Sequence, residues 1–344
     1  MLNPRVRLMN ALAASDSKLS EKFLRLDSVE DERTRDGISS GSQSEWSLER
    51  ALDESTRNRY KDVLPWDKNR VRLQVPEDGC DYINASPITL QAPGLRPRTY
   101  IASQGPTKST IPHFWHMIAD ETKDPAVIVM LTPTHEGHRE KCAHYWPDRH
   151  SDYADAGFAA RVTLQSKEHN KDANCVVRKF RLDEYSADNQ QAVKKSKTVY
   201  HLLFDSWGDF TTPVPSHERN LISMCNLANR LNRHEESPLV VHCSAGVGRT
   251  GTFITIDFLL NCLTTGTLDA KGVAGTPATP ATEYFVRSAP LLYNGSHPDL
   301  QAKDDPVFET VWNLRKQRML MVQNVFQFIF IYKIIKLALA TCRE

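Results

Sequence analysis

Cys243 and Arg249 are two chemically versatile residues that stand close together in the sequence. A cysteine thiolate is a strong nucleophile, and an arginine guanidinium can bind two oxygens of one phosphate at once. The residues between them are small or apolar, so no bulky side chain would keep a phosphate away from the backbone; they are Ser244, Ala245, Gly246, Val247 and Gly248. This pair at this spacing indicates phosphoryl transfer to cysteine.

The segments on either side predict the elements that would position this pair. Residues 239–241 are apolar and indicate a buried strand, whereas residues 252–260 show the pattern of a helix. A strand, a glycine-containing loop and a helix N-terminus direct backbone N–H groups and the helix dipole at an anion. The same surroundings should lower the pKa of the Cys243 thiol. A lone cysteine at a strand end is usually a small buried residue, but the combined pattern favours a phosphate site.

The run 242–251 resembles the signature loop of the cysteine-dependent protein tyrosine phosphatases, and the resemblance covers roughly residues 52–337. It is closest to the tyrosine-specific, non-receptor class, with features of a fungal-like branch. The resemblance implies an α/β (α+β) fold, in which a highly twisted mixed β-sheet is flanked by helices on both faces. It also implies hydrolysis of phosphotyrosine in proteins through a cysteinyl-phosphate intermediate.

The resemblance assigns a role to each polar residue of this loop. Cys243 would be the nucleophile, and Arg249 would bind the phosphate oxygens together with the loop amides that begin at Ser244. Thr250 would hydrogen-bond the sulfur and make it a better leaving group, and His242 would support the loop and the thiolate. Arg249 and the backbone dipoles carry the charge in this scheme, so neither a metal nor another cofactor is expected.

Residues 206–215 resemble the mobile acid loop of the same family. Asp209 would be the general acid and then the base, Trp207 an anchor, and Phe210 a lid over the substrate ring. The sequence departs from the family pattern at Gly208, where proline is usual, and at residues 211–212, where Gly-Val is usual. Because proline restricts a loop and glycine frees it, we expect a looser acid loop.

Two further segments resemble substrate-binding parts of the family. Residues 57–67 resemble the phosphotyrosine-recognition loop, in which Tyr60 would stack on the substrate ring and Asp62 would bind the peptide backbone. Residues 322–328 resemble the glutamine loop, in which Gln323 would orient the attacking water and Gln327 would assist. An amide suits this task because it can donate and accept without adding charge. Asn324 stands where the family usually has threonine.

Supporting residues are expected around these loops. Residues 136–147 resemble the glutamate loop, so Glu136 would pair with Arg249 and Lys141 would contact the acid loop. Arg315 and Arg318 could form part of a second phosphate site. Leu320, where some family members have glycine, would block the path to that site.

The chain is organised around this catalytic region. Residues 1–45 are predicted to be a polar, partly flexible extension with a helix at 17–29 and a Ser/Gly linker at 37–44. Residues 46–344 are predicted to be the catalytic domain, interrupted by a Thr/Gly/Ala/Pro-rich insertion at about 264–282. The apolar segment 325–340 contains charged residues and predicts a buried helix; an anchoring tail is the alternative. Other expected elements are a helix at 46–54, strands at 71–73, 82–85, 99–103, 126–131, 161–165, 175–181 and 199–204, and helices at 113–120 and 218–232.

Composition limits the classes of function. The chain has 344 residues, 40% hydrophobic and 25% charged, with a formal net charge of +1. This balance argues against nucleic-acid binding and against stable membrane insertion. The seven cysteines show no paired spacing and no zinc pattern, which favours a reducing compartment. We expect a cytoplasmic protein with possible nuclear access, monomeric, acting in signal transduction on phosphotyrosine-containing protein substrates.

Two other classes of function stay open from the residues alone. Another enzyme with the same cysteine–arginine spacing would act on phosphoserine, phosphothreonine or phosphoinositides. Lipid-directed members tend to have lysines inside the loop, and residues 244–248 contain none. A binding module that captures phosphotyrosine without turnover is favoured only by Gly208.

Overall fold

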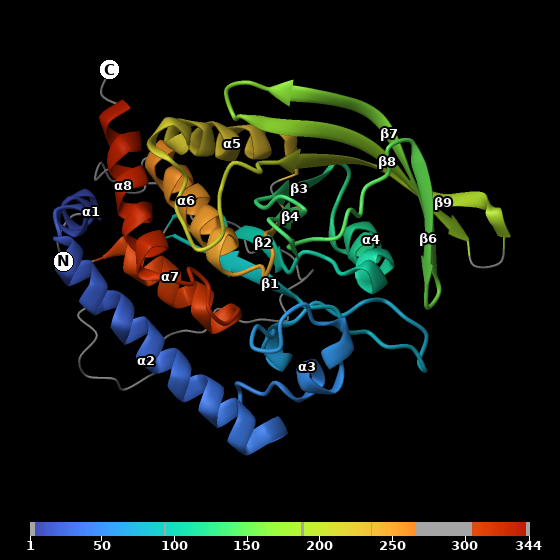
Figure 1. The fold of residues 1–344 in the computed structure, drawn as a ribbon, viewed down its shortest axis with the longest axis horizontal. Helices are drawn as coiled ribbons and strands as arrows, with labels where there is room; N and C mark the ends of the chain where they lie inside the picture. Colours follow the sequence, from blue (N-terminus) through green and yellow to red (C-terminus); the bar gives the residue numbers. More distant parts are fainter. Residues whose placement is uncertain (1–3, 93, 187–188, 235, 266–304, 342–344) are drawn as a thin grey trace.

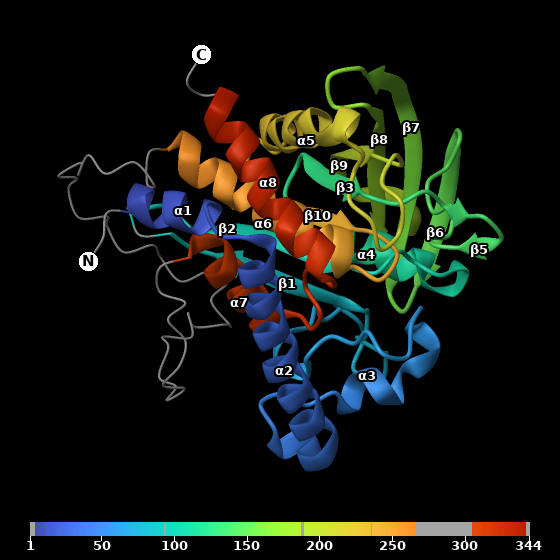
Figure 2. The same cartoon turned by 60° about the vertical axis from the view of Figure 1, so that its left-hand side comes forward.

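A mixed β-sheet forms the centre of the fold, with helices against both faces (Figures 1 and 2). The computed structural model describes residues 4–92, 94–186, 189–234, 236–265 and 305–341. Within these ranges the main sheet has eight strands, in the order β1-β2-β10-β3-β9-β8-β7-β6. They are β1 (Ala85–Leu90), β2 (Arg98–Ser103), β3 (Ala126–Met130), β6 (His150–Asp155), β7 (Phe158–Asn170), β8 (Cys175–Ser186), β9 (Asn189–Leu203) and β10 (Leu239–His242); β4 (His135–Glu136) and β5 (Arg139–Glu140) form a separate hairpin.

The middle of the sheet is parallel and the outer strands are antiparallel. β10 pairs in parallel with β2 and β3, and β3 pairs in parallel with β9. β3 and β10 are buried along their whole length, which explains their nearly continuous apolar sequence. Alternate side chains of β3 belong to different cores, with Val127 and Val129 on one face and Ile128 and Met130 on the other.

Each face of the sheet is covered by its own helices. The core on one face includes α6 (Gly248–Thr264) and α8 (Val325–Thr341), and the core on the other includes α4 (Ile111–Glu121) (Figure 2). The expected α/β (α+β) fold, a twisted mixed sheet flanked by helices on both faces, is confirmed. The helices are α1 (Pro4–Leu12), α2 (Asp16–Ser40), α3 (Glu49–Asp53), α4 (Ile111–Glu121), α5 (Glu218–Leu231), α6 (Gly248–Thr264), α7 (Pro306–Gln317) and α8 (Val325–Thr341).

Most of the predicted elements are confirmed, and two short strands are not. Between residues 71–73 and 82–85 the chain makes only an isolated bridge, from Arg72 to Tyr82, and β1 starts where the second prediction ends. The apolar residues there are buried in core clusters rather than in a β-ladder. Part of the predicted insertion, residues 266–282, lies outside the described residues.

The N-terminal helices pack on the catalytic core. Leu8 of α1 and Phe23 of α2 belong to the same core as α6 and α8, which agrees with the helix predicted at 17–29. The predicted linker at 37–44 is wrong, because α2 continues to Ser40 and a 3-10 turn follows. Gly37 allows close packing rather than flexibility: a Cβ there would lie 2.1 Å from the Trp46 carbonyl oxygen.

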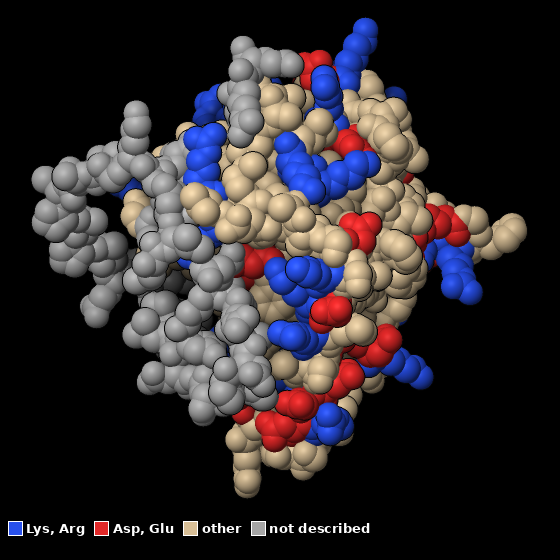
Figure 3. Space-filling view, turned by 90° about the vertical axis from the view of Figure 1, so that its left-hand side faces the viewer, with Lys and Arg blue, Asp and Glu red and all other residues tan. Residues whose placement is uncertain are grey.

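The C-terminal helix α8 is buried as predicted, with Ile331 and Ile335 in the core. Among the described residues, no helix is both long and apolar enough to cross a membrane. On the face that carries the N-terminal helices, basic and acidic side chains are interspersed wherever described residues are visible (Figure 3). This pattern fits the near-neutral charge of the whole chain.

Candidate active site

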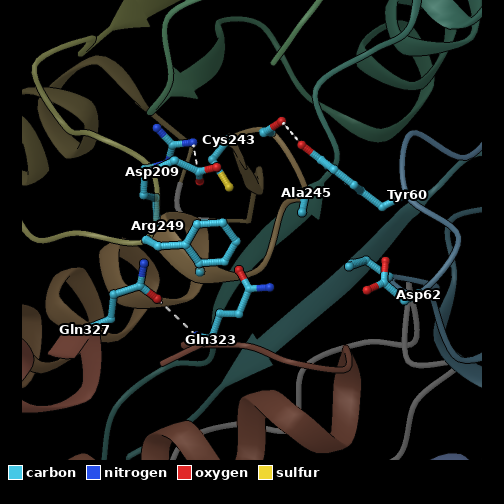
Figure 4. Close-up of a pocket in the computed structure, with 12 residues that line it drawn as sticks. Tyr60, Asp62, Asp209, Cys243, Ala245, Arg249, Gln323 and Gln327 are labelled. Carbon is cyan, nitrogen blue, oxygen red and sulfur yellow. Dashed lines mark hydrogen bonds and ion pairs between the residues drawn. The ribbon is translucent and has the colours of Figure 1, made fainter. Parts of the chain in front are cut away.

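A small pocket of about 100 Å³ lies at the end of β10, where the loop 243–247 leads into α6 (Figure 4). Every lining residue except Val63 is among the site residues predicted from the sequence. The lining consists of Tyr60, Asp62, Val63, Asp209, Phe210, Cys243, Ser244, Ala245, Gly248, Arg249, Gln323 and Gln327. The fold therefore joins the predicted recognition, acid, phosphate and glutamine loops, which are far apart in the sequence.

The loop 243–247 is shaped so that backbone amides face the cysteine. The Gly246 N–H donates to the Cys243 sulfur at 3.3 Å. Gly246 has a φ of 74°, and a Cβ there would lie 2.1 Å from the Ser103 carbonyl oxygen, so only glycine fits. Val247 precedes α6 and has an apolar side chain that cannot cap the first amides of the helix. Those amides are therefore available to an anion.

Cys243 is the only described cysteine whose pKa is lowered. Burial by itself would raise the pKa of this thiol, but Arg249, the Thr250 hydroxyl and the amides of Thr250 and Gly246 outweigh it. The Thr250 hydroxyl is buried and makes no hydrogen bond of good geometry within the described residues. It is therefore free to donate to the sulfur.

His242 lies behind the loop and is neutral. Burial lowers the pKa of His242 to about 4. Its Nε2 lies 2.8 Å from the Tyr145 hydroxyl, and its Nδ1 lies 3.1 Å from the Cys243 carbonyl oxygen. A neutral ring satisfies both contacts if Nδ1–H donates to the carbonyl and Nε2 accepts from Tyr145. His242 thus fixes the backbone of Cys243.

Arg249 connects three loops around the pocket. Its guanidinium donates to Glu136 Oε1 at 2.8 Å, to the Trp207 carbonyl oxygen at 2.8 Å and to Asp209 Oδ1 at 3.0 Å. Lys141 forms an ion pair with Asp209 and lies 3.9 Å from Glu136. The contacts expected for Glu136 and Lys141 are therefore present. Arg249 is only 2% exposed, so its charge is little screened by solvent.

The acid loop is held by internal hydrogen bonds despite the glycine at position 208. The buried Trp207 donates from Nε1 to the Thr211 carbonyl oxygen at 2.8 Å, and the Thr211 hydroxyl donates to the Gly208 carbonyl oxygen at 2.8 Å. Phe210 has a φ of 55° and is 59% exposed at the mouth of the pocket. Thr211, where the family usually has glycine, therefore supplies part of the restraint that proline would give.

Asn324 links the glutamine loop to the acid loop. Its Nδ2 donates to the Phe210 carbonyl oxygen at 3.2 Å, while its Oδ1 accepts from the Gln327 N–H at 2.9 Å at the start of α8. The second bond is a helix cap and fixes the side chain for the first. Asn324 therefore holds the acid loop over the pocket by a hydrogen bond to Phe210.

We expect Asn324→Ser to lower kcat/KM for a phosphotyrosine peptide by about 2- to 5-fold, the effect of one exposed hydrogen bond. Serine keeps the helix cap but is too short to reach Phe210. Steady-state kinetics measures the effect, and Gly208→Pro, which stiffens the loop independently, should reduce it. Equal kcat/KM in Asn324→Ser and in the parent chain would show that the hydrogen bond from Asn324 to Phe210 has no catalytic role.

The recognition loop contacts the phosphate loop directly. The Tyr60 hydroxyl lies 2.8 Å from Ser244 Oγ. Arg59 anchors the recognition loop to residues 104–105. Its N–H donates to Gln104 Oε1 at 2.8 Å, and its Nε donates to the Gly105 carbonyl oxygen at 2.9 Å. The sequence does not indicate this role of Arg59, because one more arginine in a polar loop carries no signal of its partners.

Two glutamines close the pocket on the side of α8 (Figure 4). Gln327 is buried, and its Oε1 accepts from the Gln323 N–H at 3.1 Å. A Cβ at Gly248 would lie 3.0 Å from the Gln327 amide and 3.2 Å from Gln323 Oε1. Glycine at this position therefore lets both amides approach the phosphate loop.

The second phosphate site predicted at Arg315 and Arg318 is wrong. Both side chains are buried and bind the protein itself. Arg318 donates to the Gly246 carbonyl oxygen at 2.9 Å and to Asn84 Oδ1 at 2.7 Å. Arg315 donates to the carbonyl oxygens of residues 321 and 322. Their guanidinium groups therefore stabilise these loops from inside the protein and do not face solvent.

No group of three or more His, Cys, Asp or Glu side chains that could hold a metal occurs within the ranges the structure describes. The charge at the pocket comes from Arg249 and Lys141, balanced by Glu136 and Asp209. A thiol of lowered pKa beside this arginine, backbone amides and a carboxyl group can support phosphoryl transfer.

Comparison with known proteins agrees with this chemistry. The family model described as protein-tyrosine phosphatase matches residues 54–275. Tyrosine-protein phosphatase 1 of Saccharomyces cerevisiae is 36% identical over 347 residues, covering 92% of this chain and 93% of that protein. Tyrosine-protein phosphatase 2 of Schizosaccharomyces pombe is 34% identical, covering 91% of this chain but only 38% of that longer protein.

A solved structure shares the whole fold. The chain in "Structural basis of PTPN18 fingerprint on distinct HER2 tyrosine phosphorylation sites" has a TM-score of 0.72 and 27% identity, covering 99% of this chain and 100% of that chain. The chain belongs to the protein-tyrosine phosphatase family, in its non-receptor class. It is an enzyme that hydrolyses phosphotyrosine, and its yeast relatives fit the expected fungal-like branch.

Proposed function

We propose that this enzyme removes phosphate from tyrosine side chains of protein substrates, with Cys243 as nucleophile, Arg249 as phosphate ligand and Asp209 as acid and base. One observation carries the assignment: the only described thiol of lowered pKa shares a pocket with these two groups. The solved structures of PTPN18 in complex with HER2-pY1196 and HER2-pY1248 phosphopeptides support a peptide ligand.

In the first step the Cys243 thiolate attacks phosphorus and an S–P bond forms. The P–O bond to tyrosine breaks, and the protonated Asp209 carboxyl gives its proton to the departing tyrosyl oxygen. Arg249 and the loop amides bind the equatorial oxygens, where charge gathers in the loose transition state. The guanidinium is already held by Glu136 and Trp207 at 2.8 Å, so little reorganisation is needed.

In the second step a water molecule attacks the cysteinyl phosphate. Gln323 orients this water with help from Gln327, and Asp209 takes its proton. The new O–P bond forms as the S–P bond breaks, and Cys243 leaves as a thiolate. The Thr250 hydroxyl, which already lowers the pKa of Cys243, can stabilise that thiolate by a hydrogen bond.

Selection of tyrosine would follow from the depth of the pocket. Tyr60, fixed by Ser244, forms one wall, and the exposed Phe210 would cover the substrate ring from the other side. Asp62 at the rim would bind the substrate backbone. The shorter side chains of phosphoserine and phosphothreonine would not bring phosphorus to Cys243.

The first test compares phosphotyrosine, phosphoserine and phosphothreonine peptides without added metal. Turnover of phosphotyrosine alone supports the proposal. Turnover of all three would favour a broader phosphatase. Tight binding of phosphotyrosine peptide without turnover would support the binding-module alternative instead.

Asp209→Asn is expected to lower kcat for a phosphotyrosine peptide by about 10²-fold, the usual contribution of a positioned general acid. The loss should be smaller for 4-nitrophenyl phosphate, because its leaving group needs less protonation. Stopped-flow and steady-state assays on both substrates measure this difference. Asp205→Asn, at an exposed position just before the loop, is the matched control and should retain full activity.

We also propose a monomeric enzyme in the cytoplasm, with access to the nucleus and a role in signal transduction. The six described cysteines are all free thiols, and a thiol of lowered pKa is readily oxidised, so both features suit a reducing compartment. The catalytic domain is proposed to begin at residue 46 and to carry its insertion at about 264–282.

A further inference from the structure

The backbone just before Gln323 adopts a conformation that its residues disfavour. Leu320 has a φ of 58° and Val322 a φ of 62°, both in the left-handed region. Neither is glycine, and the β-branched side chain of Val322 makes that region especially unfavourable. Such a conformation persists only when surrounding contacts hold it.

Those contacts come from two buried side chains, Glu30 and Arg315. The Leu320 N–H donates to Glu30 Oε1 in a short hydrogen bond. Arg315 donates from Nε to the Met321 carbonyl oxygen at 3.1 Å and from a terminal nitrogen to the Val322 carbonyl oxygen at 2.9 Å. Glu30 is 3% exposed and Arg315 is 1% exposed. The strained backbone is therefore restrained at three successive residues.

Helix α2 positions this arginine as well. Asp27 Oδ1 accepts from Arg315 at 2.8 Å, Glu30 Oε2 lies 3.6 Å from Arg315 Nε, and the guanidinium lies 5.1 Å from the centre of the Phe23 ring. Figure 2 shows α2 running alongside α7 toward the loop that precedes α8. Two acidic side chains and an aromatic ring of α2 thus surround Arg315, whose guanidinium binds the loop before α8.

The restraint continues from this loop into the phosphate loop. The Val322 N–H donates to the Val247 carbonyl oxygen at 3.1 Å. A Cβ at Gly251 would lie 2.5 Å from the same Val322 nitrogen. The next residue is Gln323, which lines the pocket. The position of the Gln323 amide therefore depends on the conformation that Glu30 stabilises.

We propose that Glu30 is a positioning residue for the hydrolytic step, acting through Leu320 and Arg315 to keep Gln323 aimed at the attacking water. The proposal rests on the water-orienting role proposed above for Gln323. Helix α2 thereby contributes to catalysis, although none of its residues lines the pocket.

A specific kinetic signature follows. Cys243, Arg249 and Asp209 carry the first step, and the hydrogen bonds described for them do not involve α2. Loosening Gln323 should slow breakdown of the cysteinyl phosphate and leave its formation intact. In a two-step reaction kcat/KM reports events up to release of the phenol, whereas kcat includes breakdown. Thus kcat and KM should fall together, and a burst of phenol should appear.

The experiment measures steady-state and quenched-flow kinetics on an aryl phosphate for Glu30→Gln and Glu30→Ala. For Glu30→Ala we expect kcat and KM each to fall about 5- to 10-fold, kcat/KM to stay within about twofold, and a burst near one equivalent. Glu30→Gln should show a smaller effect, because its amide oxygen can still accept from the Leu320 N–H. Glu21→Gln, at an exposed position on α2, is the matched control and should behave as the parent chain. Thermal unfolding checks that each variant is folded.

A rescue variant and a direct variant separate the possible outcomes. Leu320→Gly removes the backbone strain at position 320, so Glu30→Ala with Leu320→Gly should show a smaller burst than Glu30→Ala alone. If Gln323→Ala gives a burst but folded Glu30 variants do not, the proposal for Glu30 is overturned and the role of Gln323 stands. If kcat/KM falls as much as kcat in the Glu30 variants, Glu30 is only structural. If Gln323→Ala gives no burst, the proposed role of Gln323 fails first.

Discussion

Cys243→Ser is expected to abolish hydrolysis of phosphotyrosine peptides, with a loss of at least about 10⁴-fold in kcat, as for removal of other catalytic nucleophiles. The reason is ionisation. Arg249, Thr250 and the loop amides lower the pKa of the thiol enough to outweigh burial, whereas a serine hydroxyl in the same place stays protonated. No other described cysteine could replace it, because burial raises the pKa of each of the others.

Binding of substrate should survive this substitution. The groups that hold the phosphate, Arg249 and the amides of residues 244–249, are unchanged in Cys243→Ser, and the negative charge of the thiolate is gone. Calorimetric titration with a phosphotyrosine peptide should therefore give an affinity at least equal to that of the parent chain. Cys80→Ser, which alters a partly exposed thiol outside the pocket, should keep normal turnover. Measurable turnover by pure Cys243→Ser would rule out Cys243 as the nucleophile.

The lowered pKa of Cys243 also fixes the direction of the pH dependence. The thiolate is the reactive form, and its pKa lies below that of an ordinary thiol. The acid limb of the kcat/KM profile should therefore lie below the range in which free cysteine titrates, and activity should fall as pH drops through it. Arg249 is the largest of the lowering influences, so its loss should move this limb toward higher pH.

The phosphate loop could be predicted from sequence because its parts are local. The strand, the loop and the helix that build it are consecutive, from Leu239 to Thr264, and each leaves its own pattern of apolar and small residues. The steric need for glycine at Gly246 is the exception, because it depends on β2: a Cβ there would lie 2.1 Å from the Ser103 carbonyl oxygen. Local chemistry and local structure point to the same function there.

Other parts of the site had no local signal. Leu320 and Glu30 are 290 positions apart, and Arg315 and Asp27 are 288 apart. Nothing in the sequence near Arg315 distinguishes a buried arginine with several protein partners from an arginine on the surface. The sequence therefore suggests a phosphate ligand there. Burial of an arginine is decided by the helix that packs over it, and that helix is α2.

The error at residues 37–44 has the same origin. Glycine and serine in a row are usual in flexible linkers, but Gly37 is small because the Trp46 backbone crosses α2 at that point. Arg33 lies 4.6 Å from the Trp46 ring and 4.8 Å from the Trp312 ring, which fixes this end of α2 against α7. Composition indicates conformational freedom, whereas tertiary packing removes it.

Arg249→Lys is the second large effect that we expect, with a loss of about 10³-fold in kcat/KM for phosphotyrosine peptides, the upper range for removing one group that stabilises charge in a transition state. The planar guanidinium binds Glu136 and Trp207 at 2.8 Å on one nitrogen and Asp209 at 3.0 Å on another. A lysine ammonium has one nitrogen and cannot hold the glutamate loop and the phosphate at the same time. Retained charge should therefore not retain activity.

Arg161→Lys is the matched control for this change, because Arg161 also makes a two-bond pair, with Asp152, but on the exposed surface. Surface pairs contribute little, so its kinetics and stability should be nearly unchanged. The double variant with Arg249→Lys and Asp209→Asn should lose less kcat/KM than the product of the two single losses. The reason is that the two side chains share a hydrogen bond. Strictly multiplicative losses would mean that the contact between Arg249 and Asp209 is not used during turnover, and the acid would then have to be positioned by Lys141 alone.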